Sequence, residues 1–378
     1  MRSLILLFIC WCGIVNASSK ATTCQQRHCL IVVDAGSTGS RLHLFAYDVD
    51  AHQHRININE LESKKITPGF ASIEPNQANI DDYLTRLFEG VSTQTIPVYF
   101  YATAGMRLIP TENQALYFQG LKNWFAANPY WSIKEARTIT GREEGIFGWL
   151  AVNYQKGALD AFDRPLVGVM DVGGASVQIT FPIPEDELAN NSNVVNIVVN
   201  GRHITLFVHS FLGLGQTALS QQFLNAGSCF PTGYLLPNKV PAKGDAFDCQ
   251  SDIARLINEV HGVSKIVEPV VKRNPLASWY AIGSVGYVVG DEPFSFKEKQ
   301  FTNQRLLEQA NNEVCQRPWG DLSAQYPDNG KLFSYCLFSS YYYALMVSGY
   351  GLEPEQIIHY MSAADATDWS LGVVLRPN

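Results

Sequence analysis

The sequence predicts an α/β protein made of two related domains. Two stretches share one plan, in which an apolar strand ends in an aspartate, a turn of small residues follows, and a second apolar strand leaves the turn; they are residues 31–49 and 166–181. Repeats of this kind reveal architecture, and segments with helical or strand periodicity alternate around both copies. With 378 residues, of which 46% are hydrophobic and 17% charged, the chain is long enough for each domain to bury its own core.

Both turns are suited to binding an anion. The first reads DAGSTGSR from Asp34 to Arg41, and the second reads DVGGASVQ from Asp171 to Gln178. Small residues let the backbone approach an anion closely, and successive N–H groups in such a turn form an anion-binding nest. One such turn is more often an ordinary hairpin turn. Because the plan occurs twice, we expect two nests that hold phosphate groups between two facing domains.

The N-terminal residues are typical of a secretory signal peptide. Arg2 precedes the apolar residues 4–15, which are too few to span a membrane. We assign residues 1–19 to the signal peptide and expect an exported mature chain with no membrane anchor. The net charge of −7 and the lack of a dense run of Lys and Arg argue against a nucleic-acid partner.

Six cysteines follow the predicted signal peptide: Cys24, Cys29, Cys229, Cys249, Cys315 and Cys336. An even number in an exported chain indicates disulfides, and proximity along the sequence favours the pairs Cys24–Cys29, Cys229–Cys249 and Cys315–Cys336. A zinc site is the less favoured alternative, because the sequence lacks both C-x-x-C spacing and a neighbouring histidine cluster among these cysteines.

The first half of the chain predicts alternating strands and helices. The expected segments are a hairpin extension over 51–65, a helix over 76–91, a buried strand over 96–102, a helix over 111–127 and a strand over 131–139. The buried strand leads into a third turn of small residues, Thr103 to Arg107. Since ligands of open α/β sheets bind beyond the carboxyl ends of strands, this turn is a further candidate for the site.

A helix is expected after the acidic pair Glu143 and Glu144, carrying the apolar residues from Ile146 onward. Acids near a helix N-terminus are usually favourable partners of the helix dipole and nothing more. Asn153 lies nine residues beyond Glu144, which places the two on opposite faces of one regular helix. If both serve a site, either Glu144 precedes the regular helix or the two reach different parts of the ligand. The change of domain should fall between residues 145 and 165.

The second half predicts a hairpin followed by helices. The expected segments are a hairpin over 194–208 that turns at Asn200-Gly201, a helix over 216–225, helices over 301–315, 337–350 and 354–361, and a last strand after Gly372. His209, at the start of a glycine-rich loop, could act as a catalytic base. A single loop histidine is more often structural.

Together these residue types meet the requirements of phosphate hydrolysis. The reaction needs donors for the phosphate oxygens, a divalent cation, an oriented water and a group that takes the proton of that water. The two nests supply donors, and Asp34 and Asp171 would hold a metal, in part through its waters. The remaining candidates are Arg41 and Arg107 for phosphate charge, and Glu144 with Ser176 and Gln178 for the water.

Five stretches resemble, in order, the five apyrase conserved regions of the ecto-nucleoside triphosphate diphosphohydrolases, the GDA1/CD39 family; they are residues 34–41, 102–107, 141–154, 171–179 and 368–372. The resemblance implies two actin/RNase H-like domains (the ASKHA superfold) with the active site in the cleft between them. It implies hydrolysis of nucleoside tri- and diphosphates to monophosphates, with Ca²⁺ or Mg²⁺ required and Mn²⁺ as a further option. By the same resemblance, we assign residues 20–150 plus 352–378 to the first domain and 151–351 to the second.

The resemblance also implies roles for individual residues. Glu144 is the general base, and Ser176 with Gln178 orients the attacking water. Aromatic stacking by Tyr287 and Tyr335 holds the nucleobase. The phosphate-binding residues are Ser37, Thr38, Gly39, Arg41, Arg107, Asn153, Gly173, Gly174 and Ala175. The residues around the hydrated metal are Asp34, Thr103, Asp171 and Trp369.

The chain is most similar in plan to the secreted bacterial members of the family, such as those of the pathogen Legionella, and we expect a monomer that binds nucleotides. Two alternatives stay open from the residues alone. One is another enzyme of the same superfold, a sugar kinase or an exopolyphosphatase. The other is a secreted nucleotide-binding or adhesive module without turnover, which would not need Glu144, Ser176 and Gln178 together.

Overall fold

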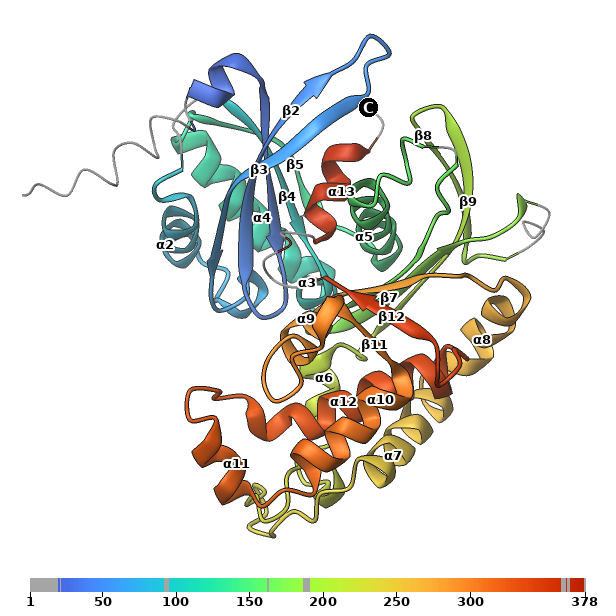
Figure 1. The fold of residues 1–378 in the computed structure, drawn as a ribbon. Helices are drawn as coiled ribbons and strands as arrows, with labels where there is room; N and C mark the ends of the chain where they lie inside the picture. The colour runs from blue at the N-terminus through green and yellow to red at the C-terminus, as the bar shows by residue number, and fades with distance from the viewer. Residues whose placement is uncertain are drawn as a thin grey trace, which may run out of the picture. The chain divides into compact units, whose positions relative to one another are not determined.

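The computed structural model describes residues 20, 22–91, 95–161, 163–185, 191–361, 365 and 368–376. Its contacts divide the chain after Thr138 into two compact units, which we describe separately. Each unit holds one sheet among the described residues, with strand orders β3-β2-β1-β4-β5 and β11-β12-β10-β6-β7-β9-β8 (Figure 1). The predicted α/β class with two sheets is therefore confirmed. The predicted signal peptide, residues 1–19, lies outside the described residues.

The first unit places the first nest and the third small-residue turn at one sheet edge. Its strands are β1 (His28–Ala35), β2 (Ser40–Val49), β3 (Arg55–Ile66), β4 (Ile96–Ala102) and β5 (Trp131–Thr138). β1 and β2 are antiparallel neighbours joined by the nest, and β4 runs parallel to β1 with Ala35 opposite Ala102. The backbone N–H of Thr103 donates to the carbonyl of Ala35 at 3.2 Å. The two turns therefore leave the sheet side by side.

Two helices pack together in the first unit, α2 (Gln77–Phe88) and α4 (Thr111–Ala127), and a short helix α3 (Ala104–Arg107) follows β4. α2 begins where Asn76 accepts a hydrogen bond from the N–H of Asn79, and it buries residues at helical spacing: Ile80, Tyr83, Leu84 and Leu87. These side chains join Phe70 and Phe100 in one core. The expected helices over 76–91 and 111–127 are confirmed.

The second unit contains the second nest in the middle of its sheet. Its strands are β6 (Gly168–Val172), β7 (Ser176–Pro182), β8 (Val194–Val199), β9 (Arg202–Leu212), β10 (Trp279–Gly283), β11 (Gln300–Thr302) and β12 (Ile357–Tyr360). The nest joins β6 to its antiparallel neighbour β7. The predicted hairpin turns at Asn200 and Gly201, whose φ angles are 50° and 76°, as a two-residue hairpin loop of this type requires.

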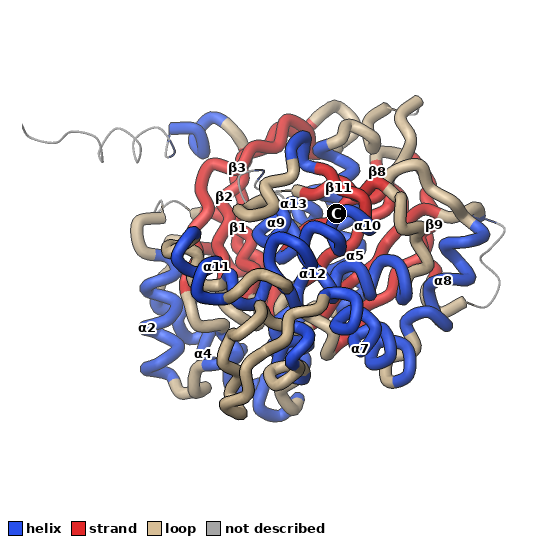
Figure 2. Tube along the Cα trace, turned by 60° about the horizontal axis from the view of Figure 1, so that its bottom comes forward, coloured by secondary structure: helices blue, strands red, loops and turns tan. Residues whose placement is uncertain are grey.

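Helices cover both faces of the second sheet. One face carries α5 (Gly141–Gln155) with α13 (Trp369–Leu375) packed beside it (Figure 1). The other helices are α6 (Gln216–Gln222), α7 (Ala246–Glu259), α8 (Val263–Arg273), α9 (Ser284–Val289), α10 (Asn303–Ala310), α11 (Trp319–Gln325) and α12 (Tyr335–Tyr343). Among these, α7, α10 and α12 lie side by side (Figure 2) and share a core with alternate residues of β7: Val177, Ile179 and Phe181. The intervening residues of β7 face α5.

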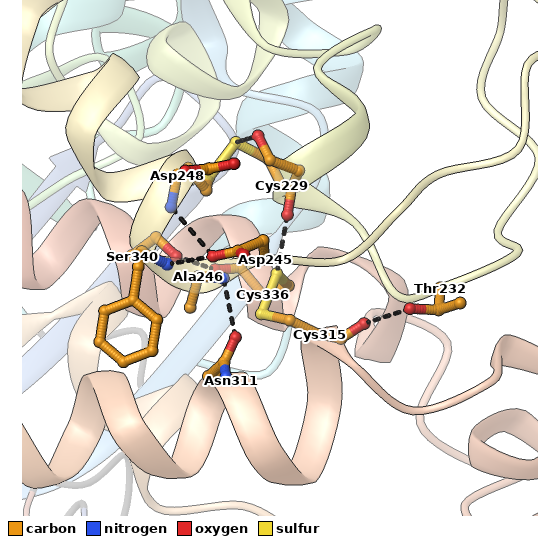
Figure 3. Close-up of a disulfide and its surroundings, with 12 residues drawn as sticks. Cys229, Thr232, Asp245, Ala246, Asp248, Asn311, Cys315, Cys336 and Ser340 are labelled. Carbon is orange, nitrogen blue, oxygen red and sulfur yellow. Dashed lines mark hydrogen bonds between the residues drawn. A yellow bond between two sulfur atoms is a disulfide. The ribbon is translucent and has the colours of Figure 1, made fainter.

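Three disulfides join the cysteine pairs that the sequence predicts: Cys24–Cys29, Cys229–Cys249 and Cys315–Cys336. The two pairs in the second unit lie in one region, where the Thr232 hydroxyl donates to the carbonyl of Cys315 and Asn311 Oδ1 accepts from the N–H of Ala246 at the start of α7 (Figure 3). Cross-links of this kind restrict the unfolded chain, so they compensate for a loop rich in Pro and Gly.

Two expected segments are wrong. Residues 354–361 do not form a helix, because Ile357–Tyr360 is strand β12, paired with β10 and β11. The chain after Gly372 is not a strand, because Trp369–Leu375 is helix α13. β12 thus lies in the sheet of the second unit, where α5 and α13 also pack against each other. The expected boundaries instead put residues 352–378 and the start of α5 in the first domain. The assignment of residues to evolutionary domains stays a prediction.

Among the described residues, no helix has both the length and the apolar character needed to cross a bilayer.

Candidate active site

The first nest is held between two glycines from other parts of its unit. A Cβ at Gly69 would lie 2.5 Å from the carbonyl oxygen of Ser37, and a Cβ at Gly105 would lie 2.8 Å from the Cα of Ser37. Side chains at either position would displace the turn. The turn between Asp34 and Arg41, which pair across β1 and β2, is therefore a tightly packed element with a defined backbone.

Some polar groups around this nest are buried in hydrogen bonds that hold the fold, whereas others are open to solvent. Tyr83 places its hydroxyl 2.8 Å from Ser40 Oγ, and burial raises the pKa of Tyr83 to about 12, so its hydroxyl stays protonated at neutral pH. Ser40 is fully buried by this contact. Asp34, Ser37 and Thr38 are partly or fully exposed, whereas Thr103 is buried at the same sheet edge. The Asp34 carboxylate and the Thr103 hydroxyl are thus neighbours of the nest.

The second nest is oriented by helix α6. Its three carbonyls accept hydrogen bonds from that side: Gln216 N–H donates to Gly173 at 2.8 Å, Thr217 N–H to Gly174 at 2.9 Å, and Gly213 N–H to Ala175 at 2.8 Å. In a planar trans peptide the carbonyl and the following N–H point in opposite directions. The N–H groups of Gly174 and Ala175 therefore point away from α6. The N–H of Gly173 is used within the turn, because it donates to the carbonyl of Ser176.

The loop before α6 is in turn fixed by the aromatic helix α12. Tyr341 donates its hydroxyl hydrogen to the carbonyl of Leu214, and Tyr342 donates to Oε1 of Gln216. A Cβ at Gly215 would lie 2.3 Å from the backbone nitrogen of Ala175, so the loop contacts the nest directly. The tyrosines of residues 341–343 pack in the helix layer, as the sequence favours, and two of them also hold the nest in place.

Glu144, Gln178 and Ser176 form one hydrogen-bonded cluster. Nε2 of Gln178 donates to Ser176 Oγ at 2.8 Å and to Glu144 Oε2 at 3.2 Å, and all three residues are at most 6% exposed. α5 begins at Thr140 with a capping box in which Glu143 takes the capping role. Glu144 is therefore released from capping and faces β7, where Gly145 packs against Gln178 and Thr180.

Asn153 is placed away from this cluster, and its amide is hydrogen-bonded within the second unit, while its role in phosphate binding stays a prediction. It is fully buried, its Nδ2 donates to the carbonyls of Trp149 and Val167, and its Oδ1 accepts from the N–H of Val167. α5 is regular from Gly141, so Glu144 lies inside the helix and Asn153 lies on its opposite face. Asn153 connects α5 to the chain that enters β6.

We expect Asn153→Ala to lower stability and leave substrate binding unchanged. Loss of the amide leaves the buried Val167 N–H without its acceptor, which should reduce the free energy of unfolding by about 3 kcal/mol. Thermal unfolding and the KM for ATP at a temperature where the variant is folded measure the two effects. A large increase in KM with unchanged stability would show that Asn153 contacts the phosphates.

The surroundings of Asp171 fit a hard cation such as Ca²⁺ or Mg²⁺. A Cβ at Gly283, whose φ is +74°, would lie 2.7 Å from Asp171 Oδ1, and a Cβ at Gly148 would lie 3.8 Å from Oδ2. The carboxylate of Asp171 therefore packs directly against the backbone of Gly283, where a side chain would displace it. Trp369, which is 4% exposed, begins α13 next to Gly148 and Phe147. Carboxylates, a threonine hydroxyl and water are the oxygen donors that these cations prefer. The structure shows no cluster of three or more His, Cys, Asp or Glu side chains suited to a metal within its described ranges.

The two expected nucleobase residues differ in exposure. Tyr287 on α9 is 46% exposed, whereas Tyr335 at the start of α12 is 3% exposed. The Tyr335 hydroxyl accepts from Asn329 Nδ2 at 3.0 Å and lies 3.4 Å from Asp291 Oδ2, and burial raises its pKa. A pocket of about 570 Å³ lies beside these groups and includes Asp291, Asn329 and Lys331. The side chain of Tyr287 is exposed to solvent, whereas the ring of Tyr335 packs nearly parallel to Phe294.

His209 has a structural environment. Its Nδ1 lies 2.8 Å from Asn193 Oδ1, and its ring contacts Phe211 with 4.3 Å between centroids. Burial, together with the charge of Arg142, lowers the pKa of His209. Its neighbour Ser210 was not among the predicted site residues, although its Oγ accepts from Gln178 Nε2 at 3.0 Å. The register of β7 and β9 brings it there, and the hairpin signal alone does not give that register.

Comparison with known proteins places the chain in a family. Residues 20–234, more than half of the chain, match the model of the GDA1/CD39 (nucleoside phosphatase) family. The chain belongs to this family. It is therefore an enzyme that hydrolyses nucleoside phosphates.

Probable apyrase 4 of Arabidopsis thaliana is 25% identical over 92% of this chain and 79% of that protein. Ectonucleoside triphosphate diphosphohydrolase 1 of Mus musculus is 26% identical over 92% of this chain and 80% of that protein.

Solved structures agree with the two-domain actin-like fold of the GDA1/CD39 family. The nucleoside triphosphate hydrolases of Neospora caninum superpose with a TM-score of 0.60 at 16% identity, over 96% of this chain and 95% of theirs. A Ppx/GppA family member of Aquifex aeolicus superposes with a TM-score of 0.56 at 13% identity, over 92% and 96%. The predicted fold class is confirmed. Because both proteins share it, the fold does not separate a nucleotidase from a Ppx/GppA enzyme, whereas the family model does. An origin in a bacterium such as Legionella stays a prediction.

Proposed function

We propose that this member of the GDA1/CD39 family is an exported apyrase, which hydrolyses the terminal phosphate of nucleoside tri- and diphosphates to leave the monophosphate. The hydrogen-bonded cluster of Glu144, Gln178 and Ser176 carries the proposal, because it joins a carboxylate to two groups that can orient a water. Ser176 and Gln178 lie on β7, the strand that directly follows the second nest and its N–H donors. A binding module would not need this combination.

In the proposed reaction, water attacks the terminal phosphorus in line with the bridging oxygen. A new P–O bond forms to the water oxygen, the bond from phosphorus to the bridging oxygen breaks, and Glu144 takes the proton of the water. Oε1 of Gln178 accepts the second hydrogen of this water, since it is buried and has no hydrogen-bond partner in the described part of the chain. Ser176 supports the same water through its hydroxyl.

Each of the two nests is proposed to bind phosphate. Ser37, Thr38 and Gly39 contribute from the first turn, and Gly174 and Ala175 donate N–H groups from the second. Gly173 contributes by its lack of a side chain, since its N–H is used within the turn. Arg41 and Arg107 neutralise phosphate charge with planar guanidinium groups.

Asp34, Thr103 and Asp171 are proposed as the residues that hold a hydrated Ca²⁺ or Mg²⁺, with Mn²⁺ as an alternative, and Trp369 packs beside Gly148, a neighbour of Asp171. Such a cation neutralises charge on the phosphate oxygens when bound.

Chelation of divalent cations should abolish activity. In excess EDTA we expect phosphate release from ATP to fall to background and to return when Ca²⁺ or Mg²⁺ is added in excess of the chelator. Phosphate release in a colorimetric assay measures both steps. Full activity in EDTA would contradict the metal role, and a thermal unfolding scan in EDTA would show whether the folded state is affected.

The nucleobase is proposed to stack on Tyr287, with Tyr335 holding the neighbouring loop through Asn329 and Asp291. Aromatic stacking tolerates different bases, so we expect ATP, GTP, UTP and CTP to be accepted. Export to the periplasm or outside is supported by the three disulfides, which form in oxidising compartments. We propose that the exported chain acts as a monomer.

Product analysis tests the proposed function. The purified chain is incubated with ATP, ADP or long-chain polyphosphate, each with Ca²⁺ or Mg²⁺, and the products are separated by ion-exchange chromatography. We expect AMP and orthophosphate from both nucleotides. Phosphate release from polyphosphate alone would instead indicate an exopolyphosphatase, and nucleotide binding without any product would indicate a binding module.

A further inference from the structure

The face of the sheet that meets α5 carries polar side chains where a buried sheet usually carries apolar ones. Ser176, Gln178 and Thr180 alternate along β7 on this face, and each is 1% exposed. The residues between them enter the apolar core on the other face. Ser210 of β9 lies directly opposite Gln178 in the strand register. Burying this many polar groups costs free energy, so their hydrogen bonds are informative.

The amide nitrogen of Gln178 lies near three hydrogen-bond acceptors but carries only two hydrogens. Its Nε2 lies 2.8 Å from Ser176 Oγ, 3.0 Å from Ser210 Oγ and 3.2 Å from Glu144 Oε2. An amide carries two N–H groups, and a carboxylate can only accept, so Nε2 must face Glu144. Oε1 is thereby turned the other way, where it is buried and unpaired with any group that the structure describes.

We propose that Ser210 is a positioning residue for hydrolysis, which holds the amide of Gln178 in the orientation that presents Oε1 to the attacking water. This inference rests on the proposed function. Ser176 is on the same strand as Gln178, and Glu144 is on the helix above, so Ser210 is the contact that ties the amide to the neighbouring strand. Without it, the amide is held by Ser176 and Glu144 alone and loses its side-chain contact with β9.

The proposal predicts an effect on turnover and not on substrate binding. Ser210 contacts Gln178, which orients the water, so its loss should leave the bound nucleotide in place while the water is misplaced. Loss of one hydrogen bond in a catalytic arrangement corresponds to about a tenfold change in rate. A merely structural role of Ser210 would instead lower stability and leave kcat unchanged for the molecules that stay folded.

Valine and threonine have nearly the same shape and differ by the hydroxyl, so Ser210→Val and Ser210→Thr form a matched pair. We expect kcat for ATP to fall about tenfold in Ser210→Val, with KM changed less than about twofold, and to be retained within about twofold in Ser210→Thr. Ser210→Ala gives the same comparison if the valine variant does not fold. Thr205→Val is the control on the same strand, because Thr205 Oγ1 donates to Asn196 Oδ1 at 2.7 Å and not to the cluster.

A double-mutant cycle with Gln178→Ala shows whether Ser210 acts through Gln178. If it does, Ser210→Val causes no further loss of kcat in the Gln178→Ala background. An unchanged kcat in Ser210→Val, or the same fold loss in both backgrounds, would overturn the inference. Glu144→Gln is measured in parallel. If Glu144→Gln is inactive and Ser210→Val is fully active, only the role of Ser210 is refuted. If Glu144→Gln is fully active, the proposed mechanism is refuted, and the role of Ser210 with it.

Discussion

Replacing Glu144 by glutamine should lower kcat for ATP hydrolysis about 1000-fold and leave KM nearly unchanged, because the general base is lost while the shape is kept. The amide oxygen of the new side chain can still accept from Gln178 Nε2, which lies 3.2 Å from Glu144 Oε2 in the native protein. The cluster should therefore survive. Steady-state phosphate release gives kcat and KM, and fluorescence titration with ATP checks binding.

The adjacent acid provides a matched control. Glu143 completes the capping box of α5, in which its Oε2 accepts from the N–H of Thr140 at 2.8 Å. Glu143→Gln should keep turnover within about twofold and reduce the free energy of unfolding by at most about 1 kcal/mol. Loss of turnover in this variant, with Glu144→Gln active, would mean that the general base is the other glutamate.

A methyl group at Gly215 should disable the second nest. A Cβ there would lie 2.3 Å from the Ala175 nitrogen and 2.4 Å from the Gly174 carbonyl carbon, so one of the two backbones must move. We expect Gly215→Ala to reduce kcat/KM at least about 100-fold and the free energy of unfolding by about 3 kcal/mol. Kinetics with ATP and denaturant unfolding measure these effects.

Gly227→Ala is the control for this substitution. A Cβ at Gly227 would meet nothing within 4 Å, and this residue lies in the loop between α6 and α7. We expect its kinetics and stability to match those of the native protein. If Gly215→Ala also behaved like the native protein, the loop would not be in contact with the nest, and its role in orienting the N–H groups of Gly174 and Ala175 would be refuted.

The nests could be predicted because their signal is local and repeated. An aspartate at a strand end and a turn of small residues are adjacent in sequence, and so are the strands that flank them. The same holds for Asn200-Gly201, where the dipeptide determines the turn, and for the three disulfides between neighbouring cysteines.

The support behind the nests could not be predicted, because it comes from distant segments. α6 and the tyrosines of α12 fix the carbonyls of residues 173–175, although α12 lies more than a hundred residues further along the chain. Ser210 reaches Gln178 only through strand register. Neither contact leaves a pattern in the sequence around the nest.

Two segments near the C-terminus show how tertiary contacts decide between helix and strand. Residues 369–375 contain the β-branched pair Val373-Val374 and suggest a strand, but Asp368 caps a helix by accepting from Ser370 N–H at 2.8 Å. Gly372 also lets this helix touch the backbone of Phe147, which a strand would not require. Residues 357–360 are apolar enough for a helix face, yet β10 and β11 pair with them on both sides.

The most direct test of attack by water on the terminal phosphorus is hydrolysis of ATP and ADP in ¹⁸O-labelled water, with the label located by mass spectrometry. We expect one ¹⁸O in each orthophosphate released and none in the AMP, because water attacks the terminal phosphorus at each step. Label in AMP, or orthophosphate that contains no ¹⁸O, would contradict attack by water on the terminal phosphorus.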